Sequence, residues 1–142
     1  MFLQLLISTA CVIATLIVHV AFVGVSVLIH SRVEDWLARG FSFFKRILAL
    51  LILTLWLMAG LSVAVWIWAA LYLVLGIFED LETAIYFSTV AFTTLGFGDI
   101  TLEGNWRILS AVMAANGLIL FSLTTAFLIE MVRRLVPERS NG

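Results

Sequence analysis

The sequence predicts an all-α membrane protein in which each chain has three transmembrane helices and one short helix that enters and leaves the membrane on the same side. Two observations support this fold class. Hydrophobic residues make up 63% of the 142 residues and charged residues only 12%, about half the charged share of an ordinary soluble domain. Three uncharged runs are long enough to cross a bilayer, whereas a fourth apolar run is too short.

The first transmembrane helix, TM1, is expected over residues 1–30. Its uncharged run from Phe2 to Ile29 would measure about 42 Å as a helix, more than the roughly 30 Å of a hydrocarbon core. No basic residue precedes the run, so we expect a retained helix rather than a signal peptide. His19 is expected to be neutral and bonded to a neighbouring helix, and a proton sensor is the alternative.

Residues 31–46 mix charged and aromatic side chains and are expected to lie at the cytoplasmic surface of the membrane as an amphipathic segment. Ser31 and Glu34 fit a capping box that would start a short helix, which Gly40 would end. A plain charged connector is the alternative. The candidates for contact with anionic lipid are three cations of this segment: Arg39, Lys45 and Arg46.

The second long uncharged run predicts TM2 over residues 47–78. An acidic cluster from Glu79 to Glu82 follows and favours the start of a new helix. The apolar part of this helix, expected over residues 81–93, would measure only about 18 Å and must turn back within the membrane. Because irregular backbone at membrane depth survives only where protein buries it or water reaches it, the loop after this helix should line a cavity.

TM3 is expected over residues 107–135, and residues 137–142 form a short tail. If residues 31–46 and the C-terminus face the cytoplasm, seven of the eight Lys and Arg residues lie inside. This strong bias predicts a multi-pass protein of the plasma or bacterial inner membrane, with its N-terminus outside. The outer side would carry five acidic residues against Arg107 alone, which attracts cations. The net charge of -1 offers no basic surface for nucleic acid.

The loop from Thr93 to Asp99 reads Thr-Thr-Leu-Gly-Phe-Gly-Asp, and packing in a bilayer does not explain this pattern. Two glycines alternate with bulky residues, two hydroxyls precede them and a carboxylate follows. Glycine adopts dihedral angles closed to other residues, so successive carbonyl groups can face the same way. We therefore interpret residues 94–99 as an ion-selectivity filter lined by backbone carbonyls.

In these residues, flanked by two spanning helices, the chain resembles the potassium-channel pore family, whose motif is Thr-Val-Gly-Tyr-Gly-Asp. The resemblance covers roughly Ile47 to Arg134 and leaves TM1 outside. It implies a homotetramer, because one loop supplies only one side of each ion cage, and passive K⁺ conduction with K⁺ as permeant ion and no cofactor. The resemblance implies that carbonyls of the first four filter residues, with the Thr94 hydroxyl, replace the water around K⁺. The residues of the expected filter are Thr94, Leu95, Gly96, Phe97 and Gly98.

The resemblance also assigns residues around the filter. Those that brace it or form its outer mouth are Tyr86, Phe87, Thr93 and Asp99. The candidates for the hinge and cavity of the inner helix are Asn116, Gly117, Phe121, Thr125 and Ile129. For Gly117, the alternative to a gating hinge is a glycine that allows close helix packing without bending. Asn116 faces either the pore or a neighbouring helix, and an ordinary interhelical seam is the alternative for the last three.

Three residues depart from the family pattern. Phe97 replaces Tyr and lacks its hydroxyl, and Leu95 replaces a β-branched residue. Val90 stands where some members carry Glu, so a carboxyl brace to Asp99 is absent. TM1 and TM2 contain no periodic Arg or Lys, so a voltage sensor of the arginine-helix kind is not expected.

The sequence has three alternative interpretations of function. The nearest is a weakly selective cation channel. Gly96 to Asp99 also fits the Gly-x-Gly-Asp motif of intramembrane aspartyl proteases, but that chemistry needs a second carboxylate at membrane depth. The other aspartates, Asp35 and Asp80, lie in charged connectors, so an enzyme is not expected. A non-conducting membrane adaptor would leave the glycine motif unexplained.

Overall fold

The computed structural model describes residues 2–38, 43–102 and 104–135; the side chains of residues 30–38, 43, 105 and 135 lie outside this description. In the described ranges every regular element is helical. The elements are α1 (Phe2–Ala38), α2 (Phe43–Val74), α3 (Leu81–Phe92), the 3₁₀ turn η1 (Gly104–Trp106) and α4 (Arg107–Leu135). The helices α1, α2 and α4 are each long and apolar enough to cross a membrane. The predicted all-α membrane fold is therefore confirmed.

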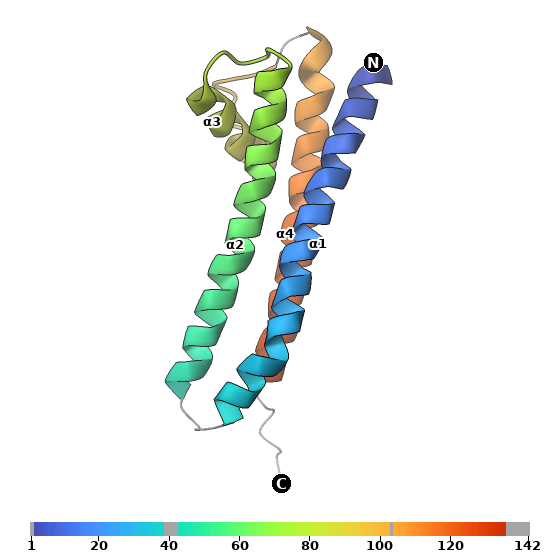
Figure 1. Cartoon of the computed structure of the whole chain (residues 1–142). Helices are drawn as coiled ribbons and strands as arrows, with labels where there is room; N and C mark the ends of the chain where they lie inside the picture. Colours follow the sequence, from blue (N-terminus) through green and yellow to red (C-terminus); the bar gives the residue numbers. More distant parts are fainter. Residues whose placement is uncertain (1, 39–42, 103, 136–142) are drawn as a thin grey trace.

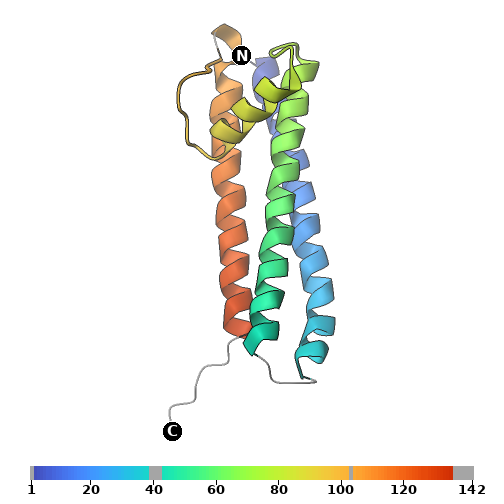
Figure 2. The same cartoon turned by 90° about the vertical axis from the view of Figure 1, so that its left-hand side faces the viewer.

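The three long helices lie side by side (Figure 1), with α1 and α4 running in one direction and α2 in the other. The short helix α3 lies at the end of the bundle where α2 ends and α4 begins. In Figure 2, α3 descends beside α4, and the loop after it climbs back to the end of the bundle from which α3 started. The α3 segment therefore enters and leaves on one side, as the length of its apolar run predicted.

The turn between α2 and α3 is built from two local devices. Gly76 has a φ of 66°, its amide donates to Leu73 O and the Ile77 amide donates to Tyr72 O, each at 3.0 Å. This pair of bonds ends a helix with a left-handed glycine. The Asp80 side chain then accepts from the Thr83 amide at 2.7 Å and caps α3, and this bond lowers the pKa of the Asp80 carboxyl.

Two helix boundaries differ from the sequence prediction. The helix start predicted at Ser31 is not found, because α1 continues without a break to Ala38; no Pro or Gly lies in that stretch to interrupt it. The second helix begins at Phe43 and ends at Val74, four residues earlier at each end than the range 47–78. At its start, α2 includes Lys45 and Arg46, whose charges at the end of long apolar stems do not require the helix to stop.

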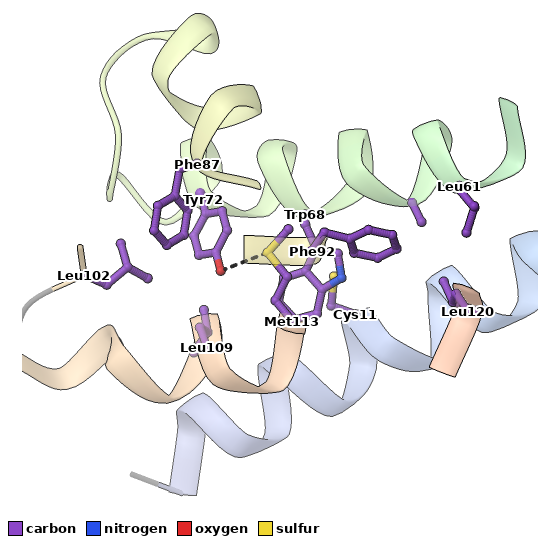
Figure 3. Packing of buried hydrophobic residues seen from close by; sticks show 11 residues of the cluster. Cys11, Leu61, Trp68, Tyr72, Phe87, Phe92, Leu102, Leu109, Met113 and Leu120 are labelled. Atoms are coloured by element: carbon purple, nitrogen blue, oxygen red, sulfur yellow. Dashed lines mark hydrogen bonds between the residues drawn. The ribbon is translucent and has the colours of Figure 1, made fainter. Parts of the chain in front are cut away.

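An aromatic cluster fixes α3 against α2 (Figure 3). The fully buried ring of Tyr72 meets Phe87 of α3 at a centroid distance of 5.4 Å and Phe78 at 5.8 Å, both edge to face. Its hydroxyl reaches the Met113 sulfur on α4 at 3.4 Å. Because edge-to-face contacts stabilise ring pairs beyond their buried area, this cluster sets the angle at which α3 enters.

Candidate functional site: the re-entrant loop after α3

The loop from Thr93 to Asp99 is tied to the end of α3 by its amide groups. The Thr94 amide donates to Ala91 O at 3.0 Å. The amides of Leu95 and Gly96 both donate to Val90 O, at 3.0 and 3.3 Å. Three successive N–H groups therefore point back toward α3.

The backbone of the loop alternates in the sign of φ. The angle is 61° at Thr94, 54° at Gly96 and 77° at Gly98, whereas Leu95 and Phe97 between them have negative values. The two glycines adopt the left-handed region at little cost, but Thr94 is β-branched and strained there. Strain of this kind persists where the surrounding structure holds it, often at functional sites. Such alternation turns successive carbonyl groups to the same side of the chain.

The carbonyl oxygens of residues 94–98 accept no hydrogen bond from the part of the chain that the structure describes. These five oxygens can still accept hydrogen bonds or bind a cation, whereas the amides of residues 94–96 already donate to α3. These carbonyl oxygens are therefore open to a partner from outside the described chain.

The inner end of the loop lies against the middle of α4. A Cβ placed on Gly117 would stand 1.9 Å from the carbonyl oxygen of Phe92, so only glycine allows this approach. Gly117 lies ten residues into α4, about 15 Å from Arg107, which is half the thickness of a hydrocarbon core. Packing alone thus accounts for Gly117, and its role as a hinge stays a prediction. The rings of Phe92 and Phe121 also meet here, with centroids 5.7 Å apart.

The outer end of the loop is held by a second contact with α3. The Tyr86 hydroxyl donates to Asp99 Oδ2 at 2.6 Å. This bond lowers the pKa of the Asp99 carboxyl and raises the pKa of the Tyr86 phenol. Since Val90 offers no carboxyl, the phenol of Tyr86 takes the bracing position next to Asp99.

Two bulky side chains of the loop have no cover within one chain. Leu95 is 59% exposed and Phe97 is 65% exposed, whereas Phe92 at the end of α3 is 1% exposed. The loop therefore combines unbonded carbonyls with exposed apolar side chains at membrane depth.

The structure places the remaining predicted site residues in three settings. Phe87 is buried and packs on Tyr72 and Phe78, so it anchors α3 from behind. The Thr93 hydroxyl donates to Thr89 O at 2.8 Å and closes the last turn of α3. On α4, Thr125 and Ile129 are exposed, and their place in a cavity wall stays a prediction.

The predicted lipid contact involves residues near the opposite end of the bundle. Lys45 and Arg46 lie in the first turns of α2 and are partly exposed. Arg39 lies outside the described residues. The contact with anionic lipid stays a prediction.

The sequence indicates polar contacts of His19 and Asn116 with a neighbouring helix but not which residues are their partners. Asn116, predicted to face either the pore or a neighbouring helix, is buried and bonds Thr15 of α1. The expected bond of His19 to a neighbouring helix is confirmed, with Thr124 of α4 as its partner. The sequence does not identify Thr15 and Thr124 as these partners, although Thr15 and His19 share one helical face at a spacing of four residues.

A family model described as "Ion channel" matches residues 60–134, more than half of the chain. The matched range holds the C-terminal part of α2, all of α3, the loop and nearly all of α4, and leaves α1 outside. No curated protein and no solved structure matches the chain significantly.

Proposed function

The chain belongs to this ion-channel pore-domain family, and on that premise we propose that four copies form a K⁺-selective channel. Ions pass down their gradient without a chemical step. The pore lies in the plasma membrane or a bacterial inner membrane. The excess of basic residues near α2's start and α4's end favours a cytoplasmic C-terminus and an external N-terminus.

The row of unbonded carbonyls from residues 94–98 carries this proposal. Backbone carbonyls in a hydrocarbon environment need a partner, because lipid offers none. A dehydrated cation satisfies several such oxygens at once, and rings of carbonyls replace the hydration shell of K⁺ in the family that this loop resembles. We therefore assign K⁺ coordination to the carbonyls of Thr94, Leu95, Gly96 and Phe97.

The same loop argues for a ring of identical chains. One loop covers one side of an ion, so a closed cage needs further copies around a common axis, and most homo-oligomers close with such symmetry. Leu95 and Phe97, exposed in the single chain, would be covered by neighbouring copies. Lipid-exposed irregular backbone does not occur in the hydrocarbon region, which favours the ring over a monomer.

The electrostatics of the α3 segment favour a cation. The C-terminal end of α3 carries a partial negative charge and lies beside Gly117 at mid-membrane depth. Asp80, Glu82 and Asp99 are exposed at the outer end and raise the local concentration of cations. Asp99 bonds a phenol rather than a second carboxylate, which favours ion passage over aspartyl-protease chemistry.

The test is ion flux in liposomes under a K⁺ or a Na⁺ gradient, with two glycine variants compared. Gly96→Ala and Gly76→Ala both force alanine into a left-handed conformation, with φ of 54° and 66°, at a similar cost of about 1–2 kcal/mol. Only Gly96 lies in the carbonyl row. We expect K⁺ flux in the wild type and in Gly76→Ala, and loss of flux in Gly96→Ala.

Each outcome distinguishes between functions. Equal permeability to K⁺ and Na⁺ would replace the proposal with a weakly selective cation channel. Unchanged flux in Gly96→Ala would remove the filter assignment. A stable monomer in mild detergent, together with no flux, would favour a non-conducting adaptor.

A further inference from the structure

One face of α1 carries buried polar side chains along half of its length. The set comprises Gln4, Ser8, Thr15 and His19, each at most 7% exposed. Polar groups buried between helices in a membrane are costly unless they are bonded, and they often serve function. Two of the four reach across to α4.

The first bond across joins α4 to α1. Asn116 Nδ2 donates to Thr15 Oγ1 at 2.8 Å. The Thr15 hydroxyl spends its own proton on Val12 O, one turn earlier, at 2.9 Å. Thr15 therefore serves α4 as an acceptor.

The second bond runs the opposite way. The Thr124 hydroxyl donates to Leu120 O at 2.8 Å and lies 3.1 Å from His19 Nε2. A hydroxyl has one proton, so the His19 contact requires Nε2–H to donate to Thr124. Each helix thus gives one donor and one acceptor, and a relative shift of α1 and α4 breaks both bonds together.

These two bonds bracket the part of α4 that supports the loop. Asn116 is next to Gly117, and Thr124 follows Phe121 by three residues; Gly117 and Phe121 are the α4 residues against Phe92. At 3.6 residues per turn, the mean direction of Asn116 and Thr124 lies about 80° around the helix from that of Gly117 and Phe121, so the two pairs occupy adjoining sides of α4. This stretch of α4 is therefore held between α1 and the inner end of α3.

We propose that α1 is an intramembrane restraint on the pore, in which Thr15 and His19 are positioning residues that hold residues 116–124 of α4 against the base of the loop. This inference rests on the proposed channel function. With α4 in place, Phe92 is fixed and the carbonyl row is supported. Release of α4 lowers the share of time that the pore conducts, and ion selectivity is unchanged because no carbonyl ligand is altered.

The buried atoms left over support a role beyond stability. His19 Nδ1 and Asn116 Oδ1 have no hydrogen-bond partner among the described residues. Apolar residues of similar size would avoid the cost of these unpaired atoms. Their presence fits contacts that specify the position of α4 rather than only strengthen the bundle.

The test uses matched threonine-to-valine substitutions, which keep side-chain shape and remove the hydroxyl. Thr15→Val and Thr124→Val lose an interhelical bond. The controls Thr9→Val and Thr54→Val lose only a bond to their own helix, to Leu5 O at 2.7 Å and to Leu50 O at 2.8 Å. Thr15→Ser and Thr124→Ser keep the hydroxyl and serve as rescue variants.

Single-channel recordings give the ratio of conducting to non-conducting time and the K⁺/Na⁺ permeability ratio. We expect the first ratio to fall about three-fold in Thr15→Val and in Thr124→Val, the effect of one average interhelical bond in a membrane. The controls and the serine variants should match the wild type, with the permeability ratio constant throughout. A rise in conducting time, or equal values in targets and controls, would overturn the restraint.

A second measurement is independent of conduction. Amide hydrogen exchange in lipid nanodiscs should be faster over residues 116–124 in Thr124→Val than in Thr54→Val. Equal exchange in this pair would refute the restraint even if the wild type carries no K⁺. Faster exchange with unchanged gating would confine α1 to a structural role and overturn its control of conduction. Wild-type liposomes without K⁺ flux would instead count against the channel function itself.

Discussion

The two halves of the re-entrant segment differ in what a single chain provides for them. The buried face of α3 is formed by Ala84, Phe87, Ser88 and Phe92. In the loop that follows, every residue from Thr93 to Asp99 is exposed. The helix is completed by side-chain packing within its own chain, whereas the loop is held by backbone amides and one tyrosine. A single chain thus builds the support and leaves the proposed ion site to an assembly.

The largest effect on the packing of α3 is expected from a substitution at Gly117. Gly117→Ala puts a methyl group against the Phe92 carbonyl, and backbone cannot yield as a side chain does. We expect a loss of stability of about 3 kcal/mol, the upper range for overpacking, measured by unfolding in detergent. Gly24→Ala is the control, because no atom lies within 4 Å of its added Cβ; it should be neutral or slightly stabilising. A stable Gly117→Ala chain would contradict the tight contact.

Two phenylalanines test the same difference, because Phe87 lies in α3 and Phe97 in the loop. Phe87→Ala removes two ring contacts and leaves a cavity at a buried position, so it should cost about 3 kcal/mol, the lower end of the range for Phe→Ala in a core. Phe97→Ala should change the unfolding free energy of the single chain by under about 0.5 kcal/mol but weaken the oligomer, as seen by cross-linking. Equal effects on single-chain stability would mean that the loop is packed within its own chain.

The outer brace gives a smaller effect. Tyr86→Phe removes the donor to Asp99 and should shorten the conducting lifetime about two- to five-fold, the range for an exposed charge-assisted contact. Single-channel recordings measure this. Asp80→Asn is the control, since it removes an acidic charge from the same helix and keeps a capping side chain. A lifetime unchanged in Tyr86→Phe would show that the brace is dispensable.

The smallest effect expected is that of external pH. The pKa of Asp99 lies below its ordinary value of 3.8, so the brace is present above that value and is lost as pH falls through the lowered pKa. The pKa of Tyr86 lies above 10.0, so its donor is lost only as pH rises through the raised pKa. K⁺ flux should therefore be constant from about pH 5 to about pH 9. A midpoint within that window would assign control to another group.

The extent and order of the helices could be predicted because they follow from apolar length. The ranges 81–93 and 107–135 agree closely with α3 and α4. Asp80 marks the start of α3, and Arg107 marks the start of α4. The continuation of α1 past Ser31 could not be predicted, since the polarity of the sequence changes there whereas the secondary structure does not. Hydropathy indicates whether a helical segment lies in lipid or in water. It does not indicate where the helix ends, because a helix continues until a residue such as Gly or Pro interrupts it.

The loop motif could be recognised from its glycines, but its support could not. The Tyr86–Asp99 bond joins residues 13 apart through a loop whose path depends on where α3 ends. The Thr15–Asn116 bond joins residues 101 apart, and single threonines in an apolar helix usually bond their own backbone. Spacing along one helix therefore indicates a polar face but does not identify its partner.

In the loop, the amide and carbonyl groups of the backbone have different partners, and this difference affects the rate at which ions can pass. The amides at the start of the loop donate hydrogen bonds to carbonyls of α3, whereas the carbonyls of residues 94–98 accept no hydrogen bond from the described residues. In the proposed filter, an ion that arrives or departs changes only the carbonyl side of each peptide group. An ion can therefore enter or leave without breaking a hydrogen bond that holds the loop. The rate of ion passage is then not limited by refolding of the loop after each ion.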